Sequence, residues 1–246
     1  MAGPVKMTPP MDSPREPHNA GVAGKLNWLR AGVLGANDGI VSVAAIVVGV
    51  AGATTAIAPI LTAGAAGLVG GAISMALGEY VSVSSQSDTQ RALIEKERRE
   101  LAEMPDEELD ELTEIYRSKG LSAKTAREVA VELTKHDALA AHLEVELHIT
   151  EGEVASPWHA ALASAIAFFI GAVLPLLAIL LPPEGIRVQV TFAAVLIALA
   201  ATGALSARIG GSHWLRPTIR VLIGGAMALA ATFIIGRVLG VSGVLG

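Results

Sequence analysis

The chain has 246 residues, of which 52% are hydrophobic, 17% are charged and 4% are aromatic, and its formal net charge is -5. A soluble domain carries about 25% charged residues, so this composition excludes an ordinary soluble enzyme. The chain has no cysteine, which also excludes disulfides, thiolate metal sites and cysteine nucleophiles.

Residues 1–24 form the first segment that differs in composition from the rest. They are polar, include five prolines and lack an apolar stretch. We therefore expect a disordered N-terminal tail and not a signal peptide.

Long uncharged runs dominate the remaining sequence. There are 40 residues without a charge between Asp38 and Glu79, 30 from Val154 to Pro183 and 20 from Val188 to Ala207. About 20 apolar residues suffice for a membrane-spanning helix, and the first run is long enough for two. The predicted spans cover about residues 30–52, 60–84, 158–181, 187–207 and 217–239. The predicted fold is an all-α integral membrane protein with five transmembrane helices and a three-helix cytosolic insert between helices 2 and 3.

This fold divides the chain after the tail into three parts. Residues 25–87 hold transmembrane helices 1 and 2, residues 88–155 the acidic insert, and residues 156–246 helices 3 to 5. The insert contains 18 of the 23 acidic residues but only 9 of the 18 Lys and Arg residues. Such a surface repels nucleic acid and attracts cations.

Three helices are predicted in the insert from helix start and stop signals. The first continues the second span to about Met104, and Pro105 suits the first turn of the next helix. Gly120 is suited to end that second helix, and Ser122 to cap a third helix that runs to about Gly152.

The distribution of Lys and Arg predicts the orientation in the membrane. Lys25 and Arg30 precede the first span, and a second basic group lies between the fourth and fifth spans, at Arg208, Arg216 and Arg220. Because positive residues are enriched in cytoplasmic loops, the N-terminus and the insert are expected in the cytosol.

The insert contains glutamates at helical spacing that could bind a metal ion. Pairs three residues apart occur at Glu100 and Glu103 and at Glu111 and Glu114, while Glu144, His148 and Glu151 would share one face of the third helix. Carboxylates with one imidazole suit Fe²⁺, Mn²⁺ or Zn²⁺. The alternative is a solvated acidic face, because basic residues interleave with the acids.

Three residues of the predicted spans are further candidates for a metal pathway. Asp38 is an ionisable residue within the first span, which favours a functional role; the alternative is a turn or helix cap at Asn37–Gly39. Met75 can offer a soft thioether, although core or lipid contact is the common role of a lone methionine. Glu79 follows near the cytoplasmic end, where simple interfacial exposure is the alternative.

Glycines give the first two spans surfaces that allow close helix packing. Gly35 and Gly39 form a G-x-x-x-G motif, and the second span carries five further glycines. Packing within the chain is the expected role, and a dimer interface is one version of it.

Several motifs are absent from the sequence. There is no G-x-x-x-x-G-K-[ST] loop for a nucleotide, and neither H-E-x-x-H nor G-x-S-x-G for a protease or esterase. The residue three before His148 is Val145, so the Glu-x-x-His motif of ferritin-like enzymes is also missing there. We therefore expect a protein that is not an enzyme and has no prosthetic group.

Two membrane motifs followed by an acidic insert resemble the vacuolar iron transporter family. The motifs are Gly35-Ala36-Asn37-Asp38-Gly39-Ile40-Val41-Ser42 and Gly71-Ala72-Ile73-Ser74-Met75-Ala76-Leu77-Gly78-Glu79-Tyr80. The resemblance covers about residues 25–240. It implies a homodimer with five membrane helices per chain that exports Fe²⁺, and often Mn²⁺, from the cytosol in exchange for protons.

The same resemblance implies roles for individual residues. Asp38 and Met75 match membrane ligands of the pathway. The matching glutamates of the cytosolic domain are Glu100, Glu103, Glu111, Glu114 and Glu151. The chain departs from the iron-transporting members in having Leu147 and His148 in place of a methionine pair, no acid at Ala66–Leu68, and Glu79 where many have glycine. Manganese, and Zn²⁺ through His148, therefore join iron as expected ions.

The sequence thus predicts a multi-pass divalent metal/proton antiporter, in the plasma membrane of a prokaryote or the vacuolar membrane of a eukaryote. A membrane-anchored metal sensor or store without transport is the alternative, and a membrane-bound ferroxidase is a second one. A buried Asp38 favours transport, because a simple anchor has no need of a carboxylate within a span.

Overall fold

The computed structural model describes residues 21–149, 156–211 and 213–242. Within these ranges the chain is all-helical and contains no β-strand, which confirms the expected fold class. The elements in chain order are α1 (Gly21–Ala53), α2 (Ile57–Glu103), α3 (Pro105–Ser118), α4 (Ala123–Val145), α5 (Pro157–Leu180), the short 3-10 helix η1 (Glu184–Ile186), α6 (Arg187–Ile209) and α7 (Leu215–Val241). The expected tail lies outside the described residues as far as residue 20, and α1 begins at Gly21.

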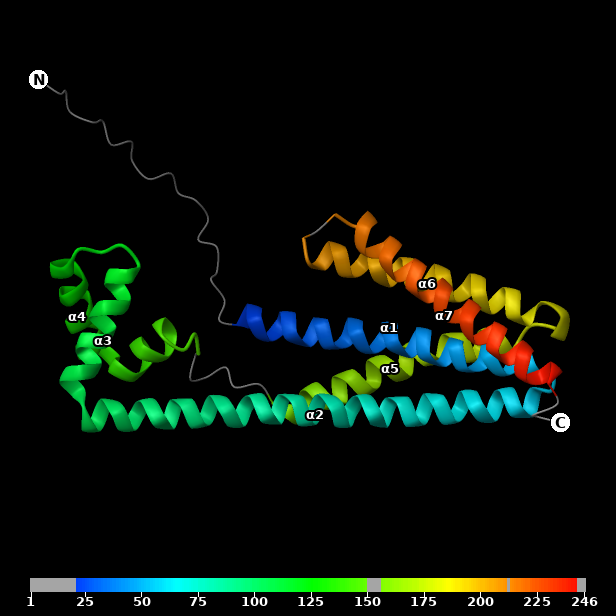
Figure 1. Cartoon of the computed structure of the whole chain (residues 1–246), viewed down its shortest axis with the longest axis horizontal. Coiled ribbons are helices and arrows are strands. Elements are labelled where there is room, and N and C mark those ends of the chain that lie inside the picture. Colours follow the sequence, from blue (N-terminus) through cyan, green and yellow to red (C-terminus); the bar gives the residue numbers. More distant parts are fainter. Residues whose placement is uncertain (1–20, 150–155, 212, 243–246) are drawn as a thin grey trace, which may run out of the picture.

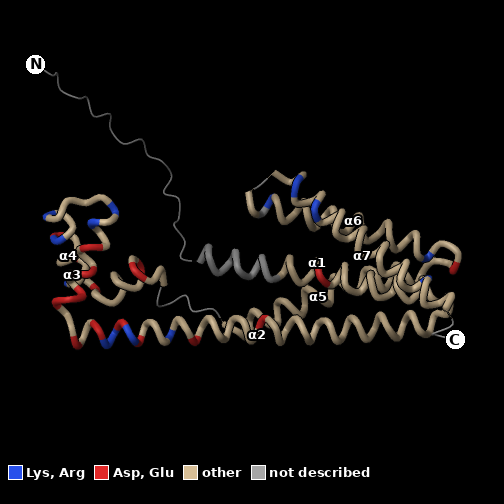
Figure 2. The backbone as a smooth tube through the Cα atoms, viewed as in Figure 1, with Lys and Arg blue, Asp and Glu red and all other residues tan. Residues whose placement is uncertain are grey.

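Five helical segments of the described chain are long and apolar enough to cross a membrane, in agreement with the five predicted spans. They are Gly32–Ala53, Ile57–Glu103, Pro157–Leu180, Glu184–Arg208 and Leu215–Val241. Many large apolar side chains on their outer surfaces are exposed, as expected for contact with lipid. Figure 2 shows few charged residues along this bundle and many around α3, α4 and the adjoining end of α2.

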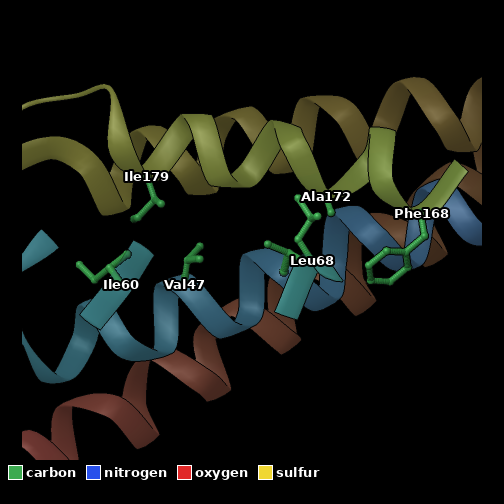
Figure 3. Close-up of a cluster of buried hydrophobic side chains, with 7 residues drawn as sticks. Val47, Ile60, Leu68, Phe168, Ala172 and Ile179 are labelled. Atoms are coloured by element: carbon green, nitrogen blue, oxygen red, sulfur yellow. The ribbon is translucent and has the colours of Figure 1, made fainter. Parts of the chain in front are cut away.

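Helix α1 occupies the centre of the bundle and packs against α2, α5, α6 and α7 (Figure 1). It presents two apolar stripes of four-residue spacing. Val43 and Val47 contact a cluster shared with α2 and α5 (Figure 3), while Ile40, Ala44 and Val48 contact a cluster shared with α6 and α7. The two clusters together bury both sides of one helix. For this reason α1 has the largest share of buried residues in its apolar stretch, 39%, among the five spans.

The contact between α1 and α5 depends on residues without a side chain. A Cβ atom at Gly39 would overlap the backbone carbonyl of Phe168, and one at Gly171 would overlap the backbone of Ala36. In lipid, helices associate through such close backbone packing, because the lipid tails are as apolar as the side chains and leave no hydrophobic driving force between helices. The G-x-x-x-G motif of the first span therefore packs within the chain, as expected.

Helix α2 links the membrane bundle to the remaining helices as one continuous element. Its 47 residues correspond to about 70 Å, roughly twice the hydrocarbon thickness of a bilayer. Figure 1 shows α3 and α4 at one end of this helix, beyond the ends of α1 and α5. Both α3 and α4 pack against α2, so side chains near its end can meet side chains of both.

The ends of α3 and α4 follow the sequence signals, with one exception. Pro105 is in the first turn of α3, and Gly120, with φ of +99°, follows its end. The Ser122 hydroxyl accepts a hydrogen bond of 3.2 Å from a backbone N–H in the first turn of α4. The expectation that the third helix runs to about Gly152 is wrong, because α4 ends at Val145.

A break at Asp137 divides α4 into two helical segments. Asp137 has non-helical backbone angles (φ -162°, ψ 96°). Its Oδ1 accepts a hydrogen bond of 3.0 Å from the backbone N–H of Ala140, as an N-cap residue does. The break redirects the last turns of α4, which carry His142.

We expect Asp137→Ala to loosen this last segment of α4. An N-cap carboxylate contributes about 1 kcal/mol, and Asp137→Asn keeps an equivalent acceptor. Hydrogen exchange of the amides of residues 138–145 in the purified protein should therefore be faster in the alanine variant and close to the parent in the asparagine variant. Equal exchange rates in the two variants would contradict the capping role.

Candidate metal centre

Three ionisable side chains from α2, α3 and α4 meet in the interior where these helices pack together. Glu97, Glu108 and His142, here named the Glu–His cluster, each offer one ligand atom within 4.8 Å of the others. His142 Nδ1 lies 3.0 Å from Glu97 Oε1 and 3.6 Å from Glu108 Oε2. The three residues are only 3%, 6% and 0% exposed, respectively. At the edge of the cluster, Glu146 Oε2 lies 3.5 Å from His142 Nδ1.

The helical phase of neighbouring apolar residues explains why these polar side chains are buried. Glu97 lies one turn beyond a buried residue of α2, Glu108 one turn before a buried residue of α3, and His142 between two buried residues of α4. These neighbours belong to two small apolar clusters, one of Ile94, Leu143 and Ile149 and the other of Leu112, Ala130 and Ala141. The packing of both clusters draws the Glu–His cluster inward with them.

Burial and mutual repulsion disfavour the charged form of both carboxylates. Burial, and then the charge of Glu146, raises the pKa of Glu97 from 4.5 to about 7. The pKa of Glu108 is also raised, first by burial and then by the charge of Glu111, while His142 opposes this rise. The site therefore gathers carboxylates whose charges repel one another, with His142 as a partial counterweight.

Two polar atoms of the cluster have no hydrogen-bond partner among the described residues. They are Glu97 Oε1 and His142 Nε2. The 3.0 Å approach of His142 Nδ1 to Glu97 Oε1 is therefore a close contact without hydrogen-bond geometry. Buried polar atoms of this kind are costly unless they gain a partner. A cation among the carboxylate oxygens and an imidazole nitrogen would provide one.

The donors of the cluster define the ions that fit. Carboxylate oxygens with one neutral imidazole and no sulfur suit Fe²⁺, Mn²⁺ and Zn²⁺. A bound divalent ion also removes the repulsion between Glu97 and Glu108, so ion binding and closure of the three helices support each other. Protons compete with the ion for the same oxygens, since the pKa of Glu97 lies near neutrality.

Two of the glutamates expected from sequence lie near this cluster. The charges of Glu100 and Glu111 both raise the pKa of Glu97 and of Glu108. Glu100 also accepts a hydrogen bond of 2.6 Å from Lys96, and its side chain is 26% exposed. Both residues are thus placed to extend the cluster toward solvent.

The other residues expected in the insert are not brought to the cluster. Glu103 is exposed, and Glu114 is exposed and paired with Arg117. His148 is exposed beyond the end of α4, and its Nδ1 lies 3.1 Å from the carbonyl oxygen of Glu144. Because α4 carries Glu144 but ends at Val145, His148 lies beyond the helix, and the expectation that these two residues share a helical face is wrong. Glu151 lies outside the described residues.

Sequence analysis missed Glu97, Glu108, His142 and Glu146 although a signal was present. Glutamates recur every three residues on α2 and on α3, so each helix offers two overlapping Glu-x-x-Glu pairs. The pair nearer the buried face is the one in phase with Ile94 on α2 and Leu112 on α3. That helical phase could be read from the sequence. The break at Asp137 that orients His142 could not.

Asp38 is held in a continuous helix within the first apolar span. Its Oδ1 accepts a hydrogen bond of 2.6 Å from the Ser42 hydroxyl, one turn along α1. The preceding residue, Asn37, accepts a hydrogen bond of 3.3 Å from Thr202 of α6. The alternative of a turn or helix cap at this motif is wrong, because α1 is unbroken from Gly21 to Ala53.

Met75 and Glu79 lie one turn apart on α2. Met75 packs against the apolar cluster shared by α1, α2 and α5, so it has a core contact whatever else it does. Glu79 is half-buried, and next to it Tyr80 packs against Trp158 of α5 with ring centroids 4.8 Å apart. An aromatic pair of this kind is typical of the membrane interface.

Comparisons with known proteins bear on the whole chain. The sequence model of the VIT family matches residues 29–237. A protein of Acanthamoeba castellanii called vacuolar iron transporter is 42% identical over 93% of this chain and 84% of its own length. Vacuolar iron transporter homolog 1 of Oryza sativa subsp. japonica is 38% identical over 89% of this chain and 77% of its own length. Vacuolar iron transporter homolog 2 of Arabidopsis thaliana is 33% identical over 95% of each chain.

The raised pKa of Glu97 predicts how pH affects the metal-free protein. Between the unfolded value near 4.5 and the folded value near 7, the folded protein binds the proton more tightly than the unfolded chain. The stability of the packing of α3 and α4 on α2 should therefore fall as pH rises through this window, by on the order of 2 kcal/mol, and level off above it.

Glu97→Gln removes this charge and should remove most of that pH dependence. In chelator-treated protein at pH 8, hydrogen exchange in α3 and α4 should be slower in this variant than in the parent, whereas the two should nearly agree at pH 5. Glu103→Gln, an exposed change on the same helix, is the matched control and should exchange like the parent at both pH values. Exchange as fast in Glu97→Gln as in the parent at pH 8 would overturn this account.

Proposed function

The chain belongs to the VIT family, and we propose that it is a membrane transporter that exports cytosolic Fe²⁺, and also Mn²⁺, in exchange for protons. The observation that carries this proposal is the Glu–His cluster, because it gathers three buried donors and one of them, Glu97, lies on the helix that continues into a membrane span. The names of the relatives, vacuolar iron transporter and vacuolar iron transporter homologs, support iron as cargo.

The region of α3, α4 and the end of α2 serves as the collecting domain for the ion. Acidic side chains on its surface attract cations, and the Glu–His cluster offers them donors out of solvent. We infer that Glu100, Glu111 and Glu146 complete the set of ligands around Glu97, Glu108 and His142. His142 adds a nitrogen donor that favours Zn²⁺ as well, so strict preference for iron is not expected.

Asp38, Met75 and Glu79 form the proposed membrane part of the pathway. The Asp38 carboxylate, which lies within the apolar span Gly32–Ala53, can hold either a proton or a metal ion. Competition between the two couples the movement of the ion to that of protons in the opposite direction. Met75 supplies a soft ligand deeper in α2, and Glu79 lies one turn nearer to the collecting domain.

Orientation and assembly complete the proposal. The basic residues at the α6–α7 connection support placing the collecting domain in the cytosol.

A homodimer is supported by α2, of which only 17% of the span is buried within one chain. Its Gly70 and Gly78 face open space, so a second copy could approach closely there. The membrane is expected to be vacuolar in a eukaryote and the plasma membrane in a prokaryote.

A membrane-anchored metal sensor or store is the second candidate function. The Glu–His cluster alone would serve either role. Asp38 favours the transporter, because the only hydrogen bond of its carboxylate within the described part of the chain is to Ser42 of its own helix, which gives a charge within a span no evident structural purpose.

Binding of Mn²⁺ by the full-length protein in detergent tests the collecting domain. The double variant Glu97→Gln and Glu108→Gln should lower the affinity at least about tenfold, because it removes two ligands from the buried site. The matched double variant Glu103→Gln and Glu114→Gln removes the same charge from exposed positions and should bind nearly as the parent. Isothermal titration calorimetry decides between them, and equal losses in both variants would refute the assignment.

Metal uptake into proteoliposomes tests the membrane pathway. Asp38→Asn keeps the shape of the side chain but removes the charge, so uptake of Fe²⁺ and Mn²⁺ driven by a pH gradient should be lost while calorimetric binding persists. Asp88→Asn, on the exposed part of α2, is the control and should transport normally. Full uptake by Asp38→Asn at saturating metal would contradict the role of Asp38, and no uptake by the parent protein would favour the sensor or store.

A further inference from the structure

An open cavity of about 940 Å³ lies at the end of the bundle opposite the collecting domain. Its walls are the ends of α1 and α7, the start of α6 and the η1 turn. Phe192 and Phe233 provide much of its apolar lining, while Glu184 and Arg237 are its charged residues. Figure 2 shows acidic and basic residues at this end of α6 and α7 in an otherwise uncharged region.

Arg237 is an exposed charge among apolar side chains and has no partner among the described residues. It is exposed four residues before the end of α7, and its exposed neighbours on that helix include Ile234, Val238 and Val241. Within the described part of the chain, neither Arg237 nor Glu184 forms an ion pair or a side-chain hydrogen bond. A cation at the rim of a membrane span gains stability from a phosphate group of the lipid.

The walls of this cavity are fixed by backbone packing and do not have to form around a ligand. A Cβ at Gly52 would lie 2.6 Å from the carbonyl oxygen of Phe233, and one at Gly236 would overlap the backbone of Gly49. Arg187 Nη1 donates a hydrogen bond of 3.0 Å to the carbonyl oxygen of Thr55, which ties the α1–α2 connection to the start of α6. A preformed site of this kind loses little entropy on binding.

We propose that this cavity binds one zwitterionic phospholipid with a primary ammonium headgroup, from the leaflet opposite the collecting domain. The lipid phosphate binds Arg237, the ammonium group binds Glu184, and an acyl chain contacts Phe192 and Phe233. Opposite charges at one rim match a headgroup that carries both charges. A primary ammonium donates hydrogen bonds to a carboxylate, which a choline headgroup cannot do. The unpaired Arg237 disfavours a cation path through this cavity, so the site is separate from the proposed metal pathway.

Native mass spectrometry of the full-length protein, after equilibration with equal amounts of phosphatidylethanolamine, phosphatidylcholine and phosphatidylglycerol, tests the proposal. The parent should retain phosphatidylethanolamine preferentially. Arg237→Gln should lower its retention about tenfold, as expected for loss of one charge-assisted contact. Glu184→Gln should lower it to the level of phosphatidylcholine without changing retention of the latter. Arg220→Gln, an exposed change near the other end of α7, is the control and should match the parent.

Three results would overturn the proposal. Equal retention in Arg237→Gln and Arg220→Gln would exclude Arg237 as the phosphate contact. Retention of phosphatidylglycerol as high as that of phosphatidylethanolamine would show that the cavity does not recognise the ammonium group. Displacement of the lipid by millimolar inorganic phosphate would assign the site to a free anion. Circular dichroism of each variant at 222 nm checks that the helices are intact, and all three changes are at exposed positions and should leave it unaltered.

Discussion

The direct contact of the α1 backbone with the α5 backbone is the constraint on which the membrane bundle depends. Gly39 and Gly171 allow this approach, and any side chain at either position would overlap the opposite helix. Once α1 lies against α5, its two apolar stripes are directed to α2 on one side and to α6 and α7 on the other. The same contact fixes the position of Asp38, the neighbour of Gly39, within the bundle.

The second constraint is the continuity of α2 between two environments. Its first half is apolar because it faces lipid and the bundle, and its second half is acidic because it faces water and the other two helices of the collecting domain. A single continuous helix has no flexible joint, so Glu97 of the Glu–His cluster and Met75 are held at a fixed separation. An ion that closes α3 and α4 around Glu97 therefore acts on the same helix that lines the proposed pathway.

The Glu–His cluster shows why a protein retains unfavourable groups in its interior. Two carboxylates and an imidazole replace apolar residues that would pack between the two small apolar clusters at lower cost. The raised pKa of Glu97 is a measure of this cost in the absence of an ion. Such an arrangement favours a bound cation over an empty site, and protonation over charge where no cation is bound.

The sequence by itself determined the all-helical class, the five spans and the helix boundaries at Pro105, Gly120 and Ser122, because these follow from apolar length and local backbone preferences. It also indicated acidic residues on three helices. The helical phase that Glu97 shares with Ile94 could be read from the sequence, whereas Glu103, six residues further, lies on another face of α2. Only the tertiary structure brings Glu97, Glu108 and His142 together in one buried cluster. The break at Asp137 matters because it places His142 against Glu97. These two residues are far apart in the chain, so local backbone preferences do not determine their contact.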